Sequence, residues 1–188
     1  MKKLVLTLAL AVTASLSSNA APLGGPVVNP ANGHYYYLLS PTDWLSSQTQ
    51  AVGLGGNLVT INDLAENNWV YATFGGLSKP LWLGLTDEAA EGTFGWVSGE
   101  AFSFSLWNAG EPNNGGGFVP DEDYVYMVES NSGLPLTPGW WNDVPVAGDG
   151  IINPVYGVVE VVPEPTAMTL VLAAGLTALF RRRQNGAA

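Results

Sequence analysis

Side chains that carry oxygen gather at four points between residues 87 and 143 of the sequence. The four clusters are Asp87, Glu88 and Glu91; Glu111, Asn113 and Asn114; Asp121, Glu122 and Asp123; and Asn142 with Asp143. Carboxylate and amide oxygens are hard ligands, and Ca²⁺ takes about six to eight of them in irregular geometry, whereas Mg²⁺ prefers a tighter octahedron. Zinc would need Cys or His, and the chain holds no Cys and only His34. Each cluster alone is compatible with a solvated turn, but the four together favour a calcium site.

Apart from its two ends, the chain is strongly acidic. Residues 21–162 contain fifteen of the sixteen acids and one of the six basic residues, Lys79, which leaves a net charge of −14. Such a surface repels nucleic acid and anionic lipid, and bound divalent cations would neutralise part of it. Acids scattered singly would serve only to keep a secreted protein soluble. Nucleic acid is therefore excluded as a partner.

Two early helices precede a region of strands and long loops. A β-prone run at 35–39 predicts a strand, and Thr42 can cap a helix over about 43–54. A short strand at 58–61 leads to a second helix over about 62–74. Five strands are then expected, at 81–85, 94–97, 123–129, 139–143 and 155–162. This order predicts an α+β domain in which the first and last strands pair, with the acidic clusters on its long loops.

The aromatic residues are expected to fill the core, because the chain has no cysteine to hold it together. Trp82, Trp96, Trp107 and Trp141 are assigned to the core beneath the loops. Adjacent strand residues point to opposite faces, so Trp140 is expected to lie outside the core.

The two ends of the chain read as targeting segments. Residues 1–20 begin with two lysines, continue with an apolar run and close on Ser-Asn-Ala, as a secretory signal peptide does. Residues 21–32 would then form a linker. The last segment, 163–188, holds Pro-Glu-Pro, an apolar stretch at 166–180 and three arginines. Fifteen residues make only a marginal span of a hydrocarbon core about 30 Å thick, with the arginines on the cytoplasmic side.

That last segment resembles the PEP-CTERM sorting signal of Gram-negative bacteria. The resemblance rests on the order of its three elements in "VPEPTAMTLVLAAGLTALFRRRQ". It implies transient membrane anchoring through the C-terminal helix, recognition by an exosortase-type protease, and delivery to the cell surface or the extracellular matrix.

The segment 33–162 resembles a C-type lectin domain. The passages that carry the resemblance are "LGGNLVTIND", "WLGLTDEAAEGTFGWVSGE", "WNAGEPNN", "DEDYVYM", "WWND" and "YGVVEV". Glu-Pro-Asn followed some thirty residues later by Trp-Asn-Asp is the most specific part. The family implies two helices, small antiparallel sheets and a long calcium-binding loop region.

The resemblance also implies a set of calcium ligands. The principal ion would be held by Glu111, Asn113, Glu122, Asn142 and Asp143. An auxiliary ion would use Asp87, Glu91, Asn114 and Asp123, together with Glu122, although the family more often has Asp where Asn114 stands. The Glu111–Pro112 bond is expected to be cis. The family's four cysteines fall on Ala51, Val159, Tyr124 and Val146, where packing would replace disulfides.

The alternation of acid and amide matches the chemistry of a sugar diol. Two vicinal hydroxyl oxygens can coordinate Ca²⁺, and each hydroxyl still has a proton to donate and a lone pair to fill. Glu111 with Asn113 could bind one hydroxyl, and Glu122 with Asn142 the other. In each pair the carboxylate would accept the hydroxyl proton and the amide would donate to the hydroxyl oxygen. The Glu-then-Asn order resembles the type that binds mannose, N-acetylglucosamine or fucose, and differs from the Gln-Pro-Asp galactose type.

We therefore expect an exported, calcium-dependent carbohydrate-binding protein of the cell surface or extracellular matrix. One alternative is a matrix or adhesion protein whose lectin-like fold binds protein or is purely structural. Another is a glycosidase that uses two acids such as Glu111 and Glu122. Carboxylates neutralised by a metal stay ionised and make poor general acids, so no enzymatic activity is expected.

Overall fold

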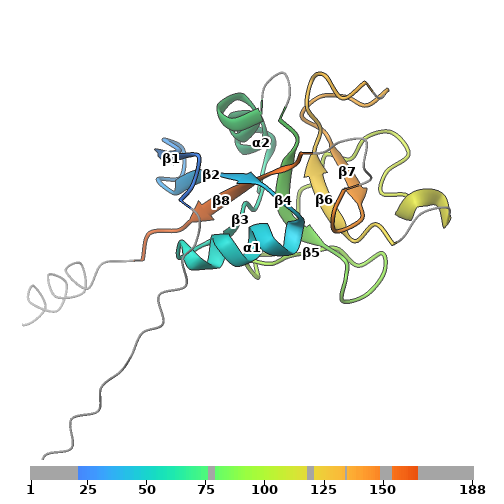
Figure 1. Cartoon of the computed structure of the whole chain (residues 1–188), viewed down its shortest axis with the longest axis horizontal. Helices are drawn as coiled ribbons and strands as arrows, with labels where there is room; N and C mark the ends of the chain where they lie inside the picture. The colour runs from blue at the N-terminus through green and yellow to red at the C-terminus, as the bar shows by residue number, and fades with distance from the viewer. Residues whose placement is uncertain (1–20, 76–78, 118–120, 134, 149–153, 165–188) are drawn as a thin grey trace, which may run out of the picture.

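The computed structural model describes residues 21–75, 79–117, 121–133, 135–148 and 154–164 (Figure 1). The expected signal peptide and the apolar stretch with its arginines lie outside these residues. Within the described part of the chain, no helix is long and apolar enough to span a membrane.

The strands form one connected sheet whose order is β1-β2-β8-β4-β6-β7. Their bounds are β1 Gly24–Val28, β2 Tyr35–Pro41, β3 Asn57–Leu58, β4 Leu81–Thr86, β5 Gly95–Trp96, β6 Tyr124–Met127, β7 Trp141–Val144 and β8 Tyr156–Val161. As expected, β2 pairs antiparallel with β8. However, β4 pairs with β8 in parallel, which joins the small antiparallel units into a single sheet. The fold class is α+β.

Side-chain hydrogen bonds define where both helices begin. Helix α1, Trp44–Gly53, is capped by Asp43, whose Oδ1 accepts from the Ser46 N–H at 2.8 Å, and not by Thr42. Helix α2, Leu64–Val70, is capped by Asp63 in the same way. It gives way to a π-helical turn, η1 at Tyr71–Gly75, so the expected second helix is regular only in its first half. A short 3₁₀ turn, η3 at Asn114–Gly117, was not anticipated from the sequence.

The segment 21–32, expected to be a linker, contains a strand of the sheet. Strand β1 pairs antiparallel with β2, with Val28 opposite Tyr35. Its Gly-Gly-Pro start gives little β signal, and the strand is specified by its partner and not by its own composition. The folded unit therefore begins before residue 33.

The two faces of the sheet carry separate hydrophobic clusters. On β4, Leu81, Leu83 and Leu85 face the cluster that includes Val70 of α2, whereas Trp82 faces the cluster that includes Trp44 of α1. This alternation is the two-residue period of a strand buried on both faces. Each fully buried side chain of this kind stabilises the fold by about 1.5–3 kcal/mol.

Most of the tryptophans lie where the sequence predicts. Trp82, Trp96 and Trp141 are buried, and Trp107 is partly buried against the same cluster as Trp141. Trp140 is 39% exposed.

Packing occupies the positions where the resemblance would put cysteines. Ala51 and Val159 share one cluster. Tyr124 is in another, against which Val146 packs.

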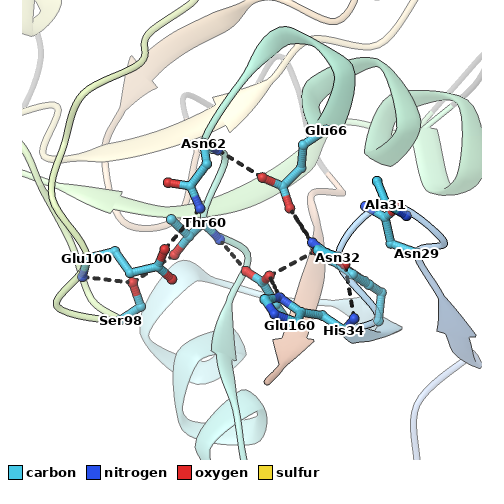
Figure 2. A network of polar contacts seen from close by, with 11 residues as sticks. Asn29, Ala31, Asn32, His34, Thr60, Asn62, Glu66, Ser98, Glu100 and Glu160 are labelled. Atoms are coloured by element: carbon cyan, nitrogen blue, oxygen red, sulfur yellow. Dashed lines mark hydrogen bonds and ion pairs between the residues drawn. The ribbon is translucent and has the colours of Figure 1, made fainter. Parts of the chain in front are cut away.

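A polar network ties the first hairpin to α2 (Figure 2). The Tyr36 hydroxyl lies 2.7 Å from Glu66 Oε1 and 2.9 Å from Glu160 Oε1. Asn32, in the turn between β1 and β2, donates to both the Tyr36 oxygen and Glu66, and His34 pairs with Glu160 at 2.7 Å. Burial, which outweighs the lowering effect of the hydrogen bonds, raises the pKa of Glu66. The network connects the turn between β1 and β2 with β2, β8 and α2.

Candidate functional site

The loop that carries Glu111 begins at a fixed point on β7. Asn108 is buried, its N–H donates to the Trp141 carbonyl at 2.9 Å, and its Oδ1 accepts from the Thr137 N–H at 2.7 Å. Its own carbonyl accepts from the Glu111 N–H at 3.0 Å. Sequence reasoning did not single out Asn108. The available signal was an amide next to Trp107 at the start of a glycine-rich loop.

Glu111 and Asn113 lie side by side at the tip of this loop. The Glu111–Pro112 peptide bond is cis, the isomer that the resemblance implies. The Asn113 Nδ2 group donates a hydrogen bond to Glu111 Oε2. A carboxylate acceptor and an amide donor thus meet directly, without a ligand between them.

The carboxylate of Asp143, on β7, binds the backbone of the same loop. Its carboxylate accepts from the Asn113 N–H at 3.1 Å and from the Asn114 N–H at 2.9 Å. Asp143 is almost fully buried, and both hydrogen bonds cross about thirty residues of sequence. The two motifs singled out in the sequence, Glu-Pro-Asn and Trp-Asn-Asp, are therefore joined in the fold.

Glu122 makes two further hydrogen bonds with the loop. Its Oε2 accepts from the Gly115 N–H at 2.6 Å, while its own N–H donates to Asn114 Oδ1 at 2.8 Å. Glu122 is buried, whereas Asp121 is exposed. The structure thus turns Glu122, and not Asp121, toward Asn114. Asn114 itself has φ +47°, a left-handed conformation that Asn tolerates better than most residues.

Asn142 presents an acceptor that no other described residue uses. Its Oδ1 is buried and has no hydrogen-bond partner among the described residues. A buried acceptor left in this state costs free energy, about 1–3 kcal/mol. Asn142 precedes Asp143 in β7, so its backbone lies at the same end of the strand as the loop contacts.

Burial and neighbouring acids change the pKa of Glu111. Burial, followed by the hydrogen bond and negative charge of Asp143 and the charge of Glu122, raises the pKa of Glu111 to about 7. Among the described residues, however, no three acidic or histidine side chains form a group that could hold a metal unaided. Amide, backbone or solvent oxygens would have to complete the coordination shell of any ion.

A second acidic group adjoins the first. Asp87, Glu91, Asn114 and Asp143 line part of a cavity of about 200 Å³, together with Gly92, Phe94, Pro112 and Asn113. Asp87 is buried; its Oδ2 accepts from the Gly92 N–H at 2.8 Å, and its Oδ1 has no partner among the described residues. Asp123 does not line the cavity, but its carbonyl accepts from the Asp87 N–H. Burial and then the charges of Asp87, Asp121 and Glu88 raise the pKa of Asp123.

Comparison with known families agrees with this architecture. The family model described as the lectin C-type domain matches residues 40–135, just over half of the chain. The chain belongs to the C-type lectin domain family. The matched residues include the Glu111 loop and Glu122, and they end before β7 and β8.

Among curated proteins, similar sequences occur in animals. The hepatic lectin of Gallus gallus is 36% identical over 112 residues, which cover 58% of this chain and 48% of that protein. The low affinity immunoglobulin epsilon Fc receptor of Mus musculus is 35% identical over 109 residues, covering 58% and 29%. The chain spans about half or less of the length of these relatives.

Solved structures give the same fold. The cow CD23 carbohydrate-recognition domain, determined in the presence of a GlcNAc2Man3 oligosaccharide, aligns with TM-score 0.57 and 24% identity over 70% of this chain and 89% of that one. The C-type lectin CEL-I from Cucumaria echinata aligns with TM-score 0.58 and 23% identity, over 70% and 91%.

Proposed function

We propose that this chain is a calcium-dependent, non-catalytic lectin that binds vicinal hydroxyls of mannose-type sugars. The observation that carries the proposal is the direct contact between Glu111 and Asn113 on a loop that is bound by the buried carboxylate of Asp143. Membership in the C-type lectin domain family supports carbohydrate binding in general.

The donor set suits a hard cation. Glu111, Asn113, Glu122, Asn142 and Asp143 would hold the principal Ca²⁺, which supplies open coordination positions for two sugar hydroxyls. The unused Asn142 oxygen would gain a partner, and the negative charges of Asp143 and Glu122, which add to the effect of burial on the pKa of Glu111, would be neutralised. Asp87, Glu91, Asn114 and Asp123 are the candidates for an auxiliary ion.

The side chains of the loop also explain how a hydroxyl would be oriented. Asn113 now donates to Glu111. A hydroxyl placed between them would accept the amide proton from Asn113 and donate its own proton to Glu111, so one hydrogen bond would become two. Glu122 and Asn142 offer a second pair with the same roles. A loop with the amide first and the acid second would favour sugars whose hydroxyl groups are arranged differently.

Retention on a mannose resin tests this function. The protein should bind in millimolar Ca²⁺ and elute with EDTA, and Glu111→Ala should abolish retention. Glu100→Ala is the matched control, because Glu100 is an exposed acid that bonds to Asn62, away from the Glu111 loop. Retention that persists in EDTA or in Glu111→Ala would refute the mechanism and favour a protein-binding or structural role.

We further propose that the protein is exported and reaches the cell surface or matrix. The support is the sequence of the two ends, which lie outside the described residues. Expression of the full chain and of a chain ending at residue 165, followed by fractionation, tests this. The full chain should be found in the membrane and surface fractions and the shortened chain in the medium; retention of both in the cytoplasm would contradict export.

A further inference from the structure

The two strands of the first hairpin, β1 and β2, and the last strand, β8, meet at one end of the sheet. Val28 of β1 lies opposite Tyr35 of β2, and Tyr35 lies opposite Val161 of β8. Residues directly opposite in neighbouring strands share a face, so these three form a row across the sheet. Val28 and Tyr35 are exposed, as is Val162, the next residue along the chain. We call the three exposed residues Val28, Tyr35 and Val162 the end patch; Val161 lies between them and packs partly against the core.

The end patch is uncharged in a strongly acidic protein. Residues 21–42, which include β1, β2 and the turn between them, contain no Asp, Glu, Lys or Arg. The only acid of β8, Glu160, is buried and paired with His34 and Tyr36. The acidic clusters lie on the loops around β6, β7 and η3, at the opposite side of the sheet (Figure 1). Glu164, an exposed acid two residues after Val162, is the acid nearest to the patch along the chain. The domain therefore has one end of low charge and one acidic end.

The chain leaves the fold at the end of low charge and reaches its apolar stretch almost at once. From Val161 to residue 166 there are five residue steps, which span at most about 18 Å when fully extended. The polar layer of a bilayer takes up about 5–8 Å of that distance on each side. If residues 166–180 enter a membrane, the folded domain must lie close to the membrane surface.

We propose that the end patch is a membrane-contact surface, which rests on the lipid while the C-terminal segment is anchored. Tyrosine and aliphatic side chains suit the interfacial layer, and the acidic end of the domain would be turned away from the lipid. The Glu111 loop then faces outward, where a glycan can reach it. This proposal rests on the anchoring proposed for the tail and does not depend on sugar binding.

The edge of β1 is poorly suited to the other obvious occupant, a second copy of the chain. Pro26 lacks an N–H group, and the pairing of β1 is interrupted between Gly24 and Val27. Prolines and bulges are devices that prevent edge strands from adding further strands. Lipid, which requires no hydrogen-bond register, fits this edge better.

Single-cysteine labelling tests the proposal cleanly, because the chain has no cysteine of its own. Tyr35→Cys and Trp140→Cys are matched, since the two side chains are 40% and 39% exposed and lie on opposite edge regions of the sheet. The full chain is labelled with a fluorophore and reconstituted into phosphatidylcholine vesicles. A water-soluble quencher should lose most of its effect on the label at 35 and keep it on the label at 140.

Removal of residues 166–188 should restore quenching at position 35. Equal quenching at the two positions in vesicle-bound protein would overturn the proposal, and so would failure of the full chain to enter vesicles. Mannose retention is measured on the same vesicles. Shielding without retention would refute the lectin function alone, whereas retention without shielding would refute the membrane-contact surface alone.

Discussion

The carboxylate of Asp143 accepts the backbone N–H of Asn114 at 2.9 Å, although twenty-nine residues separate the two. This hydrogen bond, with its neighbour to Asn113, fastens the Glu111 loop to the end of β7. The loop is glycine-rich and the domain lacks disulfides, so hydrogen bonds such as these and those of Asn108 and Glu122 must oppose its conformational entropy. Asp143 therefore has two roles, as a support for the loop and as a proposed calcium ligand.

Calcium should raise the melting temperature of the wild-type domain, and a chelator should reverse the rise. At one hundred times the dissociation constant, a ligand specific to the folded state stabilises it by about 2.7 kcal/mol. Asp143→Ala should melt lower without calcium, because each lost hydrogen bond to a charged group costs about 1.5–3 kcal/mol, and it should gain nothing from calcium. Differential scanning calorimetry, with Glu100→Ala as the control, checks this. A calcium-independent melting curve in the wild type would contradict an ordered site.

Proton release should accompany calcium binding near neutral pH. The pKa of Glu111 is raised to about 7, so the calcium-free folded protein keeps a proton that the unfolded chain loses near pH 4.5. Stability of the calcium-free form should therefore fall as pH rises through this window and stay low above it. Calcium needs the carboxylate and should displace the proton. Titration calorimetry in buffers of different ionisation enthalpy measures the release, which Glu111→Gln should remove; an unchanged release in that variant would assign it to another group.

Exchange of acid and amide within the loop should change the sugar preference. The double variant Glu111→Gln, Asn113→Asp keeps the number of charges but reverses donor and acceptor around the first hydroxyl. It reproduces the Gln-Pro-Asp order associated with galactose, so mannose signals on a glycan array should be lost and galactose signals gained. Calcium dependence should persist. A variant that still prefers mannose would show that the loop does not choose the sugar.

The sequence predicts elements that depend on local signals better than elements that depend on distant partners. Both helices and the burial of Trp82 and Trp141 follow from caps and aromatic content, whereas the pairing of β2 with β8 is expected only from the order of helices and strands along the chain. The sequence predicts a linker where β1 lies, because the Gly-Gly-Pro start has no local β signal and the strand depends on its pairing with β2. The parallel pairing of β4 with β8 joins residues more than seventy positions apart, and no local pattern encodes it.

The same distinction applies to the candidate site. Residue types and a family resemblance were enough to name Glu111, Asn113 and Asp143, and the structure brings their loop and strand together. They could not identify Asn108, whose importance lies in its hydrogen bonds to the backbone of Trp141 and Thr137. A lone amide in a loop has many possible partners, and only the fold selects among them.

Replacement of Asn114 by Asp should strengthen the auxiliary site. Asn114 lines the acidic cavity with Asp87 and Glu91, and its left-handed φ of +47° is also accessible to Asp. The added carboxylate should lower stability without calcium by repulsion and raise the affinity for a second ion. Calorimetric stoichiometry at millimolar calcium measures this. Asn68→Asp, an exposed position on α2, adds the same charge and should leave the stoichiometry unchanged; an equal gain there would reflect overall charge only.

Removal of one hydroxyl should weaken the network in Figure 2 in a pH-dependent way. Tyr36 donates toward two buried carboxylates, and its hydrogen bond lowers the pKa of Glu66, which burial raises overall. Tyr36→Phe keeps the ring but should raise that pKa further, so the loss of stability, about 1–3 kcal/mol, should be full near pH 7 and shrink as Glu66 is protonated in acid. Urea unfolding at neutral and acidic pH measures it. Tyr37→Phe, on the opposite face of β2, should show no such pH dependence, and equal losses for Tyr36→Phe at both pH values would mean that the carboxylates do not rely on the hydroxyl.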